Sequence, residues 1–332
     1  MTTLSGTPAT SRSRSPRLLR LRGLTWLVWR QHRAAFWTML GLTVVCVAWI
    51  AYQRAGMMDY LDRFGWPHPR TDDWTQGFQP QLDRLSQVGS VILGVPILLG
   101  VFVGAPLLAG DLENGTAKLV ASQSVSRVRW LTAKLGITLA VVLVCTGALG
   151  VAYGWWVGPV KATSQLTWTD ETVLDTTGPL PAALTLFTVV GGVAIGLLVR
   201  RVLMAMVVTF GFTVVLEILW VHFQLSLGSV VTVLTHSGVL RDPPQLPPGA
   251  YEVDQSYLTS SGHTVGWSTC SNAPTDKAHA ACLASNHIVG WSVKYLPVSR
   301  MSPMQWTGTA ILVALSVAVV AYVLLRSRKR LV

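Results

Sequence analysis

Residues 110–115 are the part of the chain that comes closest to a phosphate-binding loop. They read Gly-Asp-Leu-Glu-Asn-Gly, and the two glycines have the spacing of such a loop. The chain continues with Thr116-Ala117, so it lacks both the lysine that binds phosphate and the hydroxyl that binds magnesium. Asp111 and Glu113 would also repel a phosphate group. We therefore expect no ATPase site in this chain.

Motifs of membrane-embedded hydrolases are missing as well. The sequence contains neither His-Glu-x-x-His nor Gly-x-Ser-x-Gly. Its long apolar stretches contain no aspartate pair of the kind that an intramembrane aspartyl protease needs. We predict that the chain has no catalytic residues and is not an enzyme.

Glu217 is the one acidic residue inside an apolar stretch. A charged side chain at the centre of a bilayer costs roughly 2.5–3.5 kcal/mol, and such residues often contact a proton or a substrate in a translocation path. The alternative is that Glu217 lies near the membrane surface, one turn before His222, and is hydrated or paired there. We favour this second interpretation.

The four cysteines fall into two pairs. Cys270 and Cys282 lie in a long polar segment, where a disulfide closing a loop of about a dozen residues would contribute roughly 3 kcal/mol. A metal site formed with His279 and His287 is the alternative, but no Cys-x-x-Cys spacing supports it, so we favour the disulfide and expect no metal. The other pair, in apolar stretches, is expected to be small and buried: Cys46 and Cys145.

The elements that carry these residues are predicted to be membrane-spanning helices. Hydrophobic residues make up 51% of the 332 residues and charged residues only 12%, about half the charge of a soluble domain. A bilayer core needs roughly 20 apolar residues per helix. The fold class is therefore an all-α membrane protein with six transmembrane helices: approximately Ala34–Tyr52, Val88–Ala109, Gly136–Val157, Pro181–Val199, Val202–Val221 and Met304–Leu325.

The basic residues predict the orientation of these helices. The net charge is +11, and most of the Lys and Arg residues fall in the two terminal tails and in the second and fourth loops. Cytoplasmic loops of membrane proteins carry such an excess, so we expect both termini in the cytoplasm. Arg200-Arg201 then forms a tight cytoplasmic hairpin between the fourth and fifth spans. The charge indicates a membrane surface rather than nucleic acid.

Four regions follow from this topology. We expect a basic cytoplasmic tail over residues 1–33, five spans with a cytoplasmic loop at 110–135 over residues 34–221, an extracellular loop or subdomain over residues 222–303, and the sixth span with a basic tail over residues 304–332. Residues 15–33 could form an interfacial helix or the ordinary basic flank of an uncleaved signal anchor.

One cytoplasmic segment is longer than a connector needs to be. It contains Asp111, Glu113, Gly115 and Thr116, then Gln123-Ser124-Val125-Ser126-Arg127, and then Trp130 and Lys134. With these motifs, six spans and a large last exterior loop, the sequence resembles the permease subunits of type-2 ATP-binding-cassette exporters, particularly the actinobacterial drug- and antibiotic-export type. The chain has Gly110-Asp111 where relatives commonly have a basic residue followed by Glu.

The resemblance implies that this segment contains a coupling helix that docks on a separate ATPase. The chain itself would then bind no cofactor, because the partner subunit binds ATP and magnesium. The family works as two permeases with two ATPases, so a permease dimer in the plasma membrane of a bacterium is implied. The residues that would form the ATPase-coupling surface are Asp111, Glu113, Asn114, Gly115, Thr116, Arg127 and Arg129.

The leading hypothesis is thus an exporter subunit that moves an amphipathic, drug-like or lipid-like substrate outward, with antibiotic resistance as a possible role. A non-transporting membrane sensor or assembly protein, whose extracellular loop binds a ligand, is the alternative. A proton-driven transporter using Glu217 is less favoured, because the spans show few polar residues and no inverted repeat.

Overall fold

The computed structural model describes residues 24–69, 72–115, 127–163, 165–236 and 243–330. Within these residues the chain is mostly helical, as predicted, and six helical segments are long and apolar enough to cross a membrane. Each corresponds to one predicted span, although most extend beyond the predicted bounds. The six segments are His32–Asp62, Gln79–Glu113, Val128–Val157, Leu180–Val199, Val202–Leu227 and Val298–Ser327.

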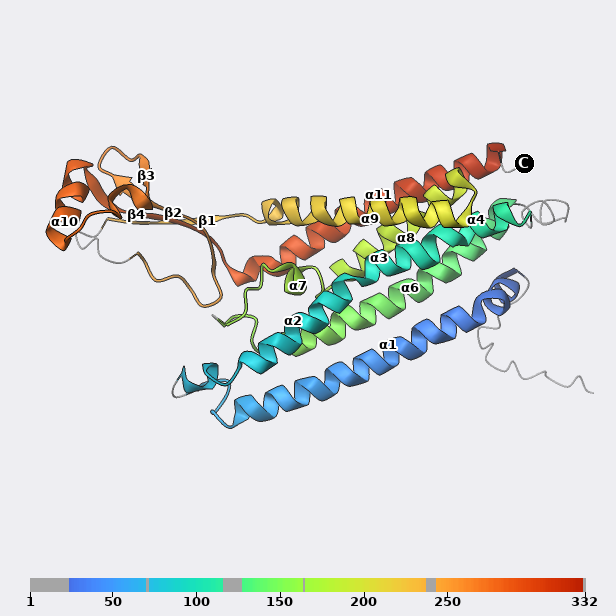
Figure 1. Cartoon of the computed structure of the whole chain (residues 1–332), viewed down its shortest axis with the longest axis horizontal. Helices are drawn as coiled ribbons and strands as arrows, with labels where there is room; N and C mark the ends of the chain where they lie inside the picture. The colour runs from blue at the N-terminus through green and yellow to red at the C-terminus, as the bar shows by residue number, and fades with distance from the viewer. Residues whose placement is uncertain (1–23, 70–71, 116–126, 164, 237–242, 331–332) are drawn as a thin grey trace, which may run out of the picture.

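The six spans run side by side in one elongated bundle (Figure 1). Five of them are formed by single long helices: α1 (Leu24–Asp62), α6 (Arg127–Val157), α8 (Leu180–Val199), α9 (Val202–Gln224) and α11 (Met301–Arg330). The start of α1, the α8–α9 link and the end of α11 lie at one end of the bundle, which we call the basic end. The opposite end, where α9 leads into a β-sheet, is the sheet end.

The second span is built from four consecutive pieces. These are α2 (Gln79–Leu93), α3 (Val95–Leu99), a π-helical turn η2 (Gly100–Gly104) and α4 (Ala105–Glu113). Pro96 and Pro106 stand in the first turns of α3 and α4, where the missing proline N–H is tolerated. Thr188 of α8 donates a hydrogen bond to the Pro96 carbonyl oxygen at 2.8 Å. Prolines and a π-turn therefore interrupt this span, and α8 supports it at the interruption.

Helix α8 is the centre of the bundle. It packs against α4, η2, α6, α9 and α11, and most of its residues are buried. A Cβ atom at Gly192 would lie 2.6 Å from the Gly100 carbonyl oxygen, so only glycine permits this approach. Small residues have the same role between helices in other membrane proteins, because there the association depends on close packing.

A four-stranded antiparallel sheet extends beyond the sheet end. Its strands are β1 (Val231–Thr235), β2 (Tyr251–Thr259), β3 (Thr264–Gly266) and β4 (Ile288–Leu296), in the order β1-β4-β2-β3. Helix α10 (Asp276–Ser285) packs next to it, and the disulfide Cys270–Cys282 belongs to the small core between them. The sequence predicted a possible subdomain at this place but no strands.

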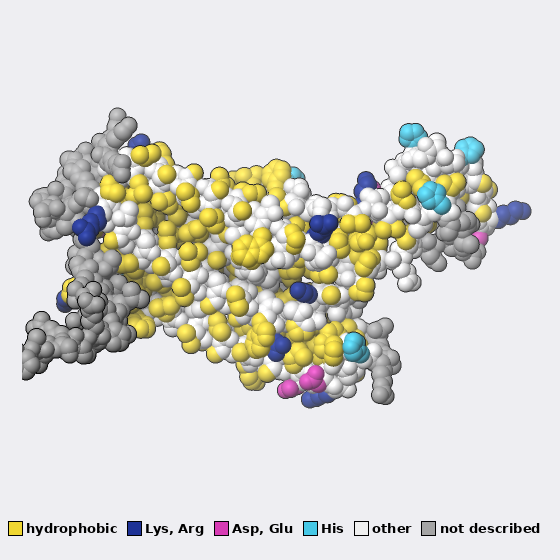
Figure 2. All heavy atoms as spheres, turned by 180° about the vertical axis from the view of Figure 1, so that it is seen from behind, with side chains coloured by type: hydrophobic (Ala, Val, Ile, Leu, Met, Phe, Trp, Pro, Cys, Tyr) yellow, Lys and Arg dark blue, Asp and Glu magenta, His cyan; other side chains and the backbone are white. Residues whose placement is uncertain are grey.

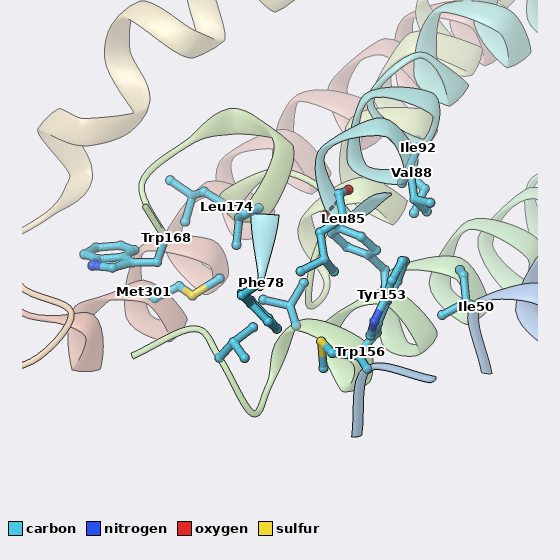
Figure 3. Close-up of a cluster of buried hydrophobic side chains, with 14 of the residues drawn as sticks. Ile50, Phe78, Leu85, Val88, Ile92, Tyr153, Trp156, Trp168, Leu174 and Met301 are labelled. Carbon is cyan, nitrogen blue, oxygen red and sulfur yellow. Dashed lines mark hydrogen bonds between the residues drawn. The ribbon is translucent and has the colours of Figure 1, made fainter. Parts of the chain in front are cut away.

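A core of buried aromatic and aliphatic side chains lies at the sheet end of the bundle (Figure 3), and Leu296 of β4 belongs to it. Tyr153 of α6 donates a hydrogen bond to the Leu85 carbonyl oxygen of α2 at 2.9 Å. Trp168, in the loop before the short helix α7 (Glu171–Leu174), donates one to the Gly249 carbonyl oxygen at 2.7 Å. Because Gly249 lies in the segment leading into β2, this hydrogen bond holds the sheet region against the bundle.

The surface agrees with a bundle that lies in a membrane. Figure 2 shows apolar side chains over the middle of one face, with charged side chains mainly toward the two ends. Exposed apolar residues are especially frequent on α9 and are also common on α1 and α11, for example Leu203, Val207, Leu42 and Val317. In lipid such side chains need no protein partner.

Candidate functional site

The turn at the basic end follows directly from the end of α4. This helix ends at Glu113, and Asn114 and Gly115 leave it, with Gly115 in the left-handed region at φ +69°. Thr116 lies outside the described residues, and so does the side chain of Arg127, the residue at which α6 begins. Arg129, on the first turn of α6, is exposed.

Asp111 forms an ion pair with Lys134 of α6. Lys134 is only 2% exposed, and its Nζ also lies 5.4 Å from the centre of the Trp130 ring. Removing one member of a buried ion pair typically costs 3–5 kcal/mol, because the other charge remains buried. The helices α4 and α6 are therefore held together by contacts of Asp111, Lys134 and Trp130. All three residues belong to the motif identified in the sequence.

Glu113 contacts a different helix. Its Oε2 accepts a hydrogen bond from the backbone N–H of Val202 at 2.7 Å, at the first turn of α9. Arg201, at the N-cap position, offers no side-chain acceptor for α9, so Glu113 supplies one from 89 positions earlier in the chain. A carboxylate at a helix N-terminus is also favoured by the helix dipole.

A shared apolar cluster lies beneath this turn. It joins Leu108 of α4, Leu131 of α6, Leu197 of α8 and Val323 of α11, all of them buried. Together with the contacts of Asp111 and Glu113, this cluster ties the end of α4 to α6, α8, α9 and α11. A force applied at the turn would therefore act on five helices.

Glu217 lies toward the opposite end of α9 from Glu113. It lines a cavity of about 480 Å³ at the sheet end, together with Glu171 of α7 and residues of α2 and α3. Its Oε1 atom is buried and accepts no hydrogen bond from the described residues. His222, which the sequence offered as a possible neighbour, stacks edge-on against Phe223 with ring centroids 4.9 Å apart.

Asp175 is a buried carboxyl that no sequence pattern indicated. It is 1% exposed and accepts a hydrogen bond from the Trp220 indole N–H at 2.9 Å. With its amide nitrogen turned toward Asp175, Gln224 donates to both carboxylate oxygens at 2.7 and 2.8 Å. Burial raises the pKa of Asp175 to about 7; the Trp220 hydrogen bond opposes this shift, and the nearby charges of Glu171 and Asp170 add to it.

The cysteines of the sheet region are not available for metal binding. Cys270 and Cys282 are bonded to each other, so neither thiolate can join His279 and His287 as a ligand. Cys145 is buried among apolar side chains of α1 and α6, and Cys46 is partly buried. Within the described residues, no group of three or more His, Cys, Asp or Glu side chains is arranged to hold a metal ion.

Comparison with known proteins identifies the family. A family model described as "ABC-2 membrane transporter related" matches residues 40–224, which include the second, third and fourth spans and most of the first and fifth. No curated protein and no solved structure matches the chain. The match covers more than half of the chain, and six apolar helices agree with it. The chain therefore belongs to the ABC-2 membrane transporter family, as a multi-pass permease subunit of an ATP-binding-cassette transporter that works with an ATPase partner.

Proposed function

We propose that the chain is the membrane subunit of an exporter, with its basic end in the cytoplasm and its sheet end outside the cell. The distribution of basic residues supports this orientation. The disulfide Cys270–Cys282 supports it too, because disulfides persist in oxidising compartments. The substrate would be an amphipathic, drug-like or lipid-like molecule, and two permease chains would work with two ATPase chains.

The observation that carries this proposal is the pair of contacts at the end of α4. Asp111 binds Lys134 of α6, and Glu113 caps the N-terminus of α9. An ATPase that moves this turn would thus move α6 and α9 together. Helix α9 carries the movement along its length, at 1.5 Å per residue, to Glu217 at the other end. Coupling of this kind needs such a chain of packed contacts between the two sites.

Charge reversal at the turn tests the site of ATPase binding. Arg129 is exposed beside the turn, and Arg129→Glu should reduce the amount of ATPase that co-purifies with the chain by about tenfold, because it reverses a charge at the proposed interface. The matched control is Arg84→Glu, an exposed arginine near the sheet end of α2, which should leave co-purification unchanged. Equal co-purification in both variants, with normal membrane insertion, would contradict the proposed docking site.

A further inference from the structure

The cavity at the sheet end has an unusual combination of walls. Leu93 and Ile97 of the second span and Ile218 of α9 supply its apolar surface. Glu171 of α7 and Glu217 of α9 supply two carboxylates from different elements. The cavity opens at the surface of the bundle, and its volume of about 480 Å³ is within the range that accommodates drug-sized ligands.

Among the residues that the structure describes, the two carboxylates have no counter-charge. No Lys, Arg or His lines the cavity, and neither Glu171 nor Glu217 takes part in an ion pair within the described part of the chain. A buried acceptor without a partner costs free energy, and the Oε1 atom of Glu217 is one. The cavity therefore favours a positively charged occupant.

The walls also indicate what kind of cation fits. Calcium takes six to eight oxygen ligands, and this cavity offers two carboxylates and the hydroxyl of Ser90, which already donates to the Ser86 carbonyl oxygen. The remaining lining residues are apolar or glycine. A hydrocarbon body carrying one positive charge matches both features, because the body covers the apolar wall and the charge meets the two carboxylates.

We propose that this cavity binds a lipophilic organic cation, with Glu217 and Glu171 as its counter-charges. The inference rests on the proposed export function and names the substrate class of the same transporter. The site lies on α9, the helix whose opposite end is capped by Glu113. Movement of the turn at the basic end would therefore reach the bound cation through a single helix.

A pair of probes with equal size and opposite charge tests the proposal. Tetraphenylphosphonium and tetraphenylborate have nearly the same shape and hydrophobic surface. The full-length chain would be placed in nanodiscs of zwitterionic lipid, and binding of each radiolabelled probe would be measured after subtraction of empty nanodiscs. We expect saturable binding of tetraphenylphosphonium and none of tetraphenylborate. Equal binding of both ions would overturn the proposal, because the cavity would then act only through its apolar wall.

Two conservative variants locate the binding site. Glu217→Gln and Glu171→Gln keep the shape of each side chain, and each should weaken tetraphenylphosphonium binding by about tenfold through the loss of one charge. Glu252→Gln is the matched control, because Glu252 is exposed on β2 in the sheet and does not line the cavity. Unchanged affinity in both cavity variants would overturn the assignment of the site.

The same variants separate this inference from the proposed function. Glu217→Gln and Glu171→Gln should still co-purify with the ATPase, and Arg129→Glu should still bind tetraphenylphosphonium. If Arg129→Glu no longer co-purifies with the ATPase but still binds tetraphenylphosphonium, both proposals are supported. A chain that co-purifies with its ATPase but does not bind the cation would refute the substrate class and leave the transporter assignment intact.

Discussion

At the scale of single residues, the functionally suggestive groups of this permease lie at its two ends. Lys134 is buried, and its pairing with Asp111 makes this burial tolerable. Asp175 is buried with two neutral donors, Trp220 and Gln224, and with no cationic partner within the described residues. Neutral donors stabilise a carboxylate less than a cation does, so the burial of Asp175 is less well compensated than the burial of Lys134.

The raised pKa of Asp175 predicts how stability changes with pH. The ordinary pKa of its carboxyl is 3.8, whereas in the folded protein it is about 7. Between these values the folded chain holds a proton that the unfolded chain has released, so stability falls as pH rises and levels off above about pH 7. Thermal unfolding in detergent should show a midpoint several degrees lower at pH 8 than at pH 5.

The variant Asp175→Asn isolates this effect. An amide cannot ionise, and its oxygen can still accept the Trp220 hydrogen bond. The midpoint of the variant should vary less with pH than that of the wild type, and the two proteins should differ most above pH 7. If the unfolding midpoint of the variant falls with rising pH as steeply as that of the wild type, then groups other than Asp175 cause the pH dependence.

At the scale of elements, α8 holds the second span and α9 connects the two ends of the bundle. Because Gly192 has no side chain, the backbone of α8 can approach the backbone of η2 closely. This contact stabilises the interrupted second span. By contrast, α9 is largely exposed to the surroundings and contacts mainly α8, α4 and η2. An element with so few buried side chains can move with less loss of packing than α8 can.

The cap on α9 gives a prediction for coupling. Glu113→Gln removes the charge and weakens the cap by about 0.5–1 kcal/mol, which is too little to unfold the bundle. ATPase binding should persist, while the amount of substrate transported per ATP hydrolysed falls, because the turn and α9 are less firmly connected. Transport and hydrolysis would be measured together in proteoliposomes. Glu252→Gln, the same substitution at an exposed position of β2, serves as control, and an equal effect of both variants would exclude a specific role of the cap.

At the scale of the whole molecule, the parts that depend on hydrophobic length were predictable. Six apolar stretches predicted the six spans, because a helix is the simplest way to satisfy backbone groups in lipid. The sheet was not predicted, since the alternation of β2 is broken by bulges near Val253 and Thr259. The partners of Glu113 and Asp175 lie 89 and 45 positions away, and no local pattern encodes such contacts.

The orientation of the bundle can be tested with the chain's own cysteines. If the sheet end faces outward, an impermeant reductant followed by an impermeant maleimide should label Cys270 and Cys282 in intact cells. Cys46 and Cys145 lie within spans and should stay unlabelled. The added cysteine of Asn114→Cys, at the basic end, should react only after the cells are lysed. If Asn114→Cys is labelled in intact cells and the two cysteines of the sheet region are not, the topology is the reverse of the one proposed. The carboxylate-lined cavity would then face the cytoplasm, and a bound cation would enter there instead of leaving.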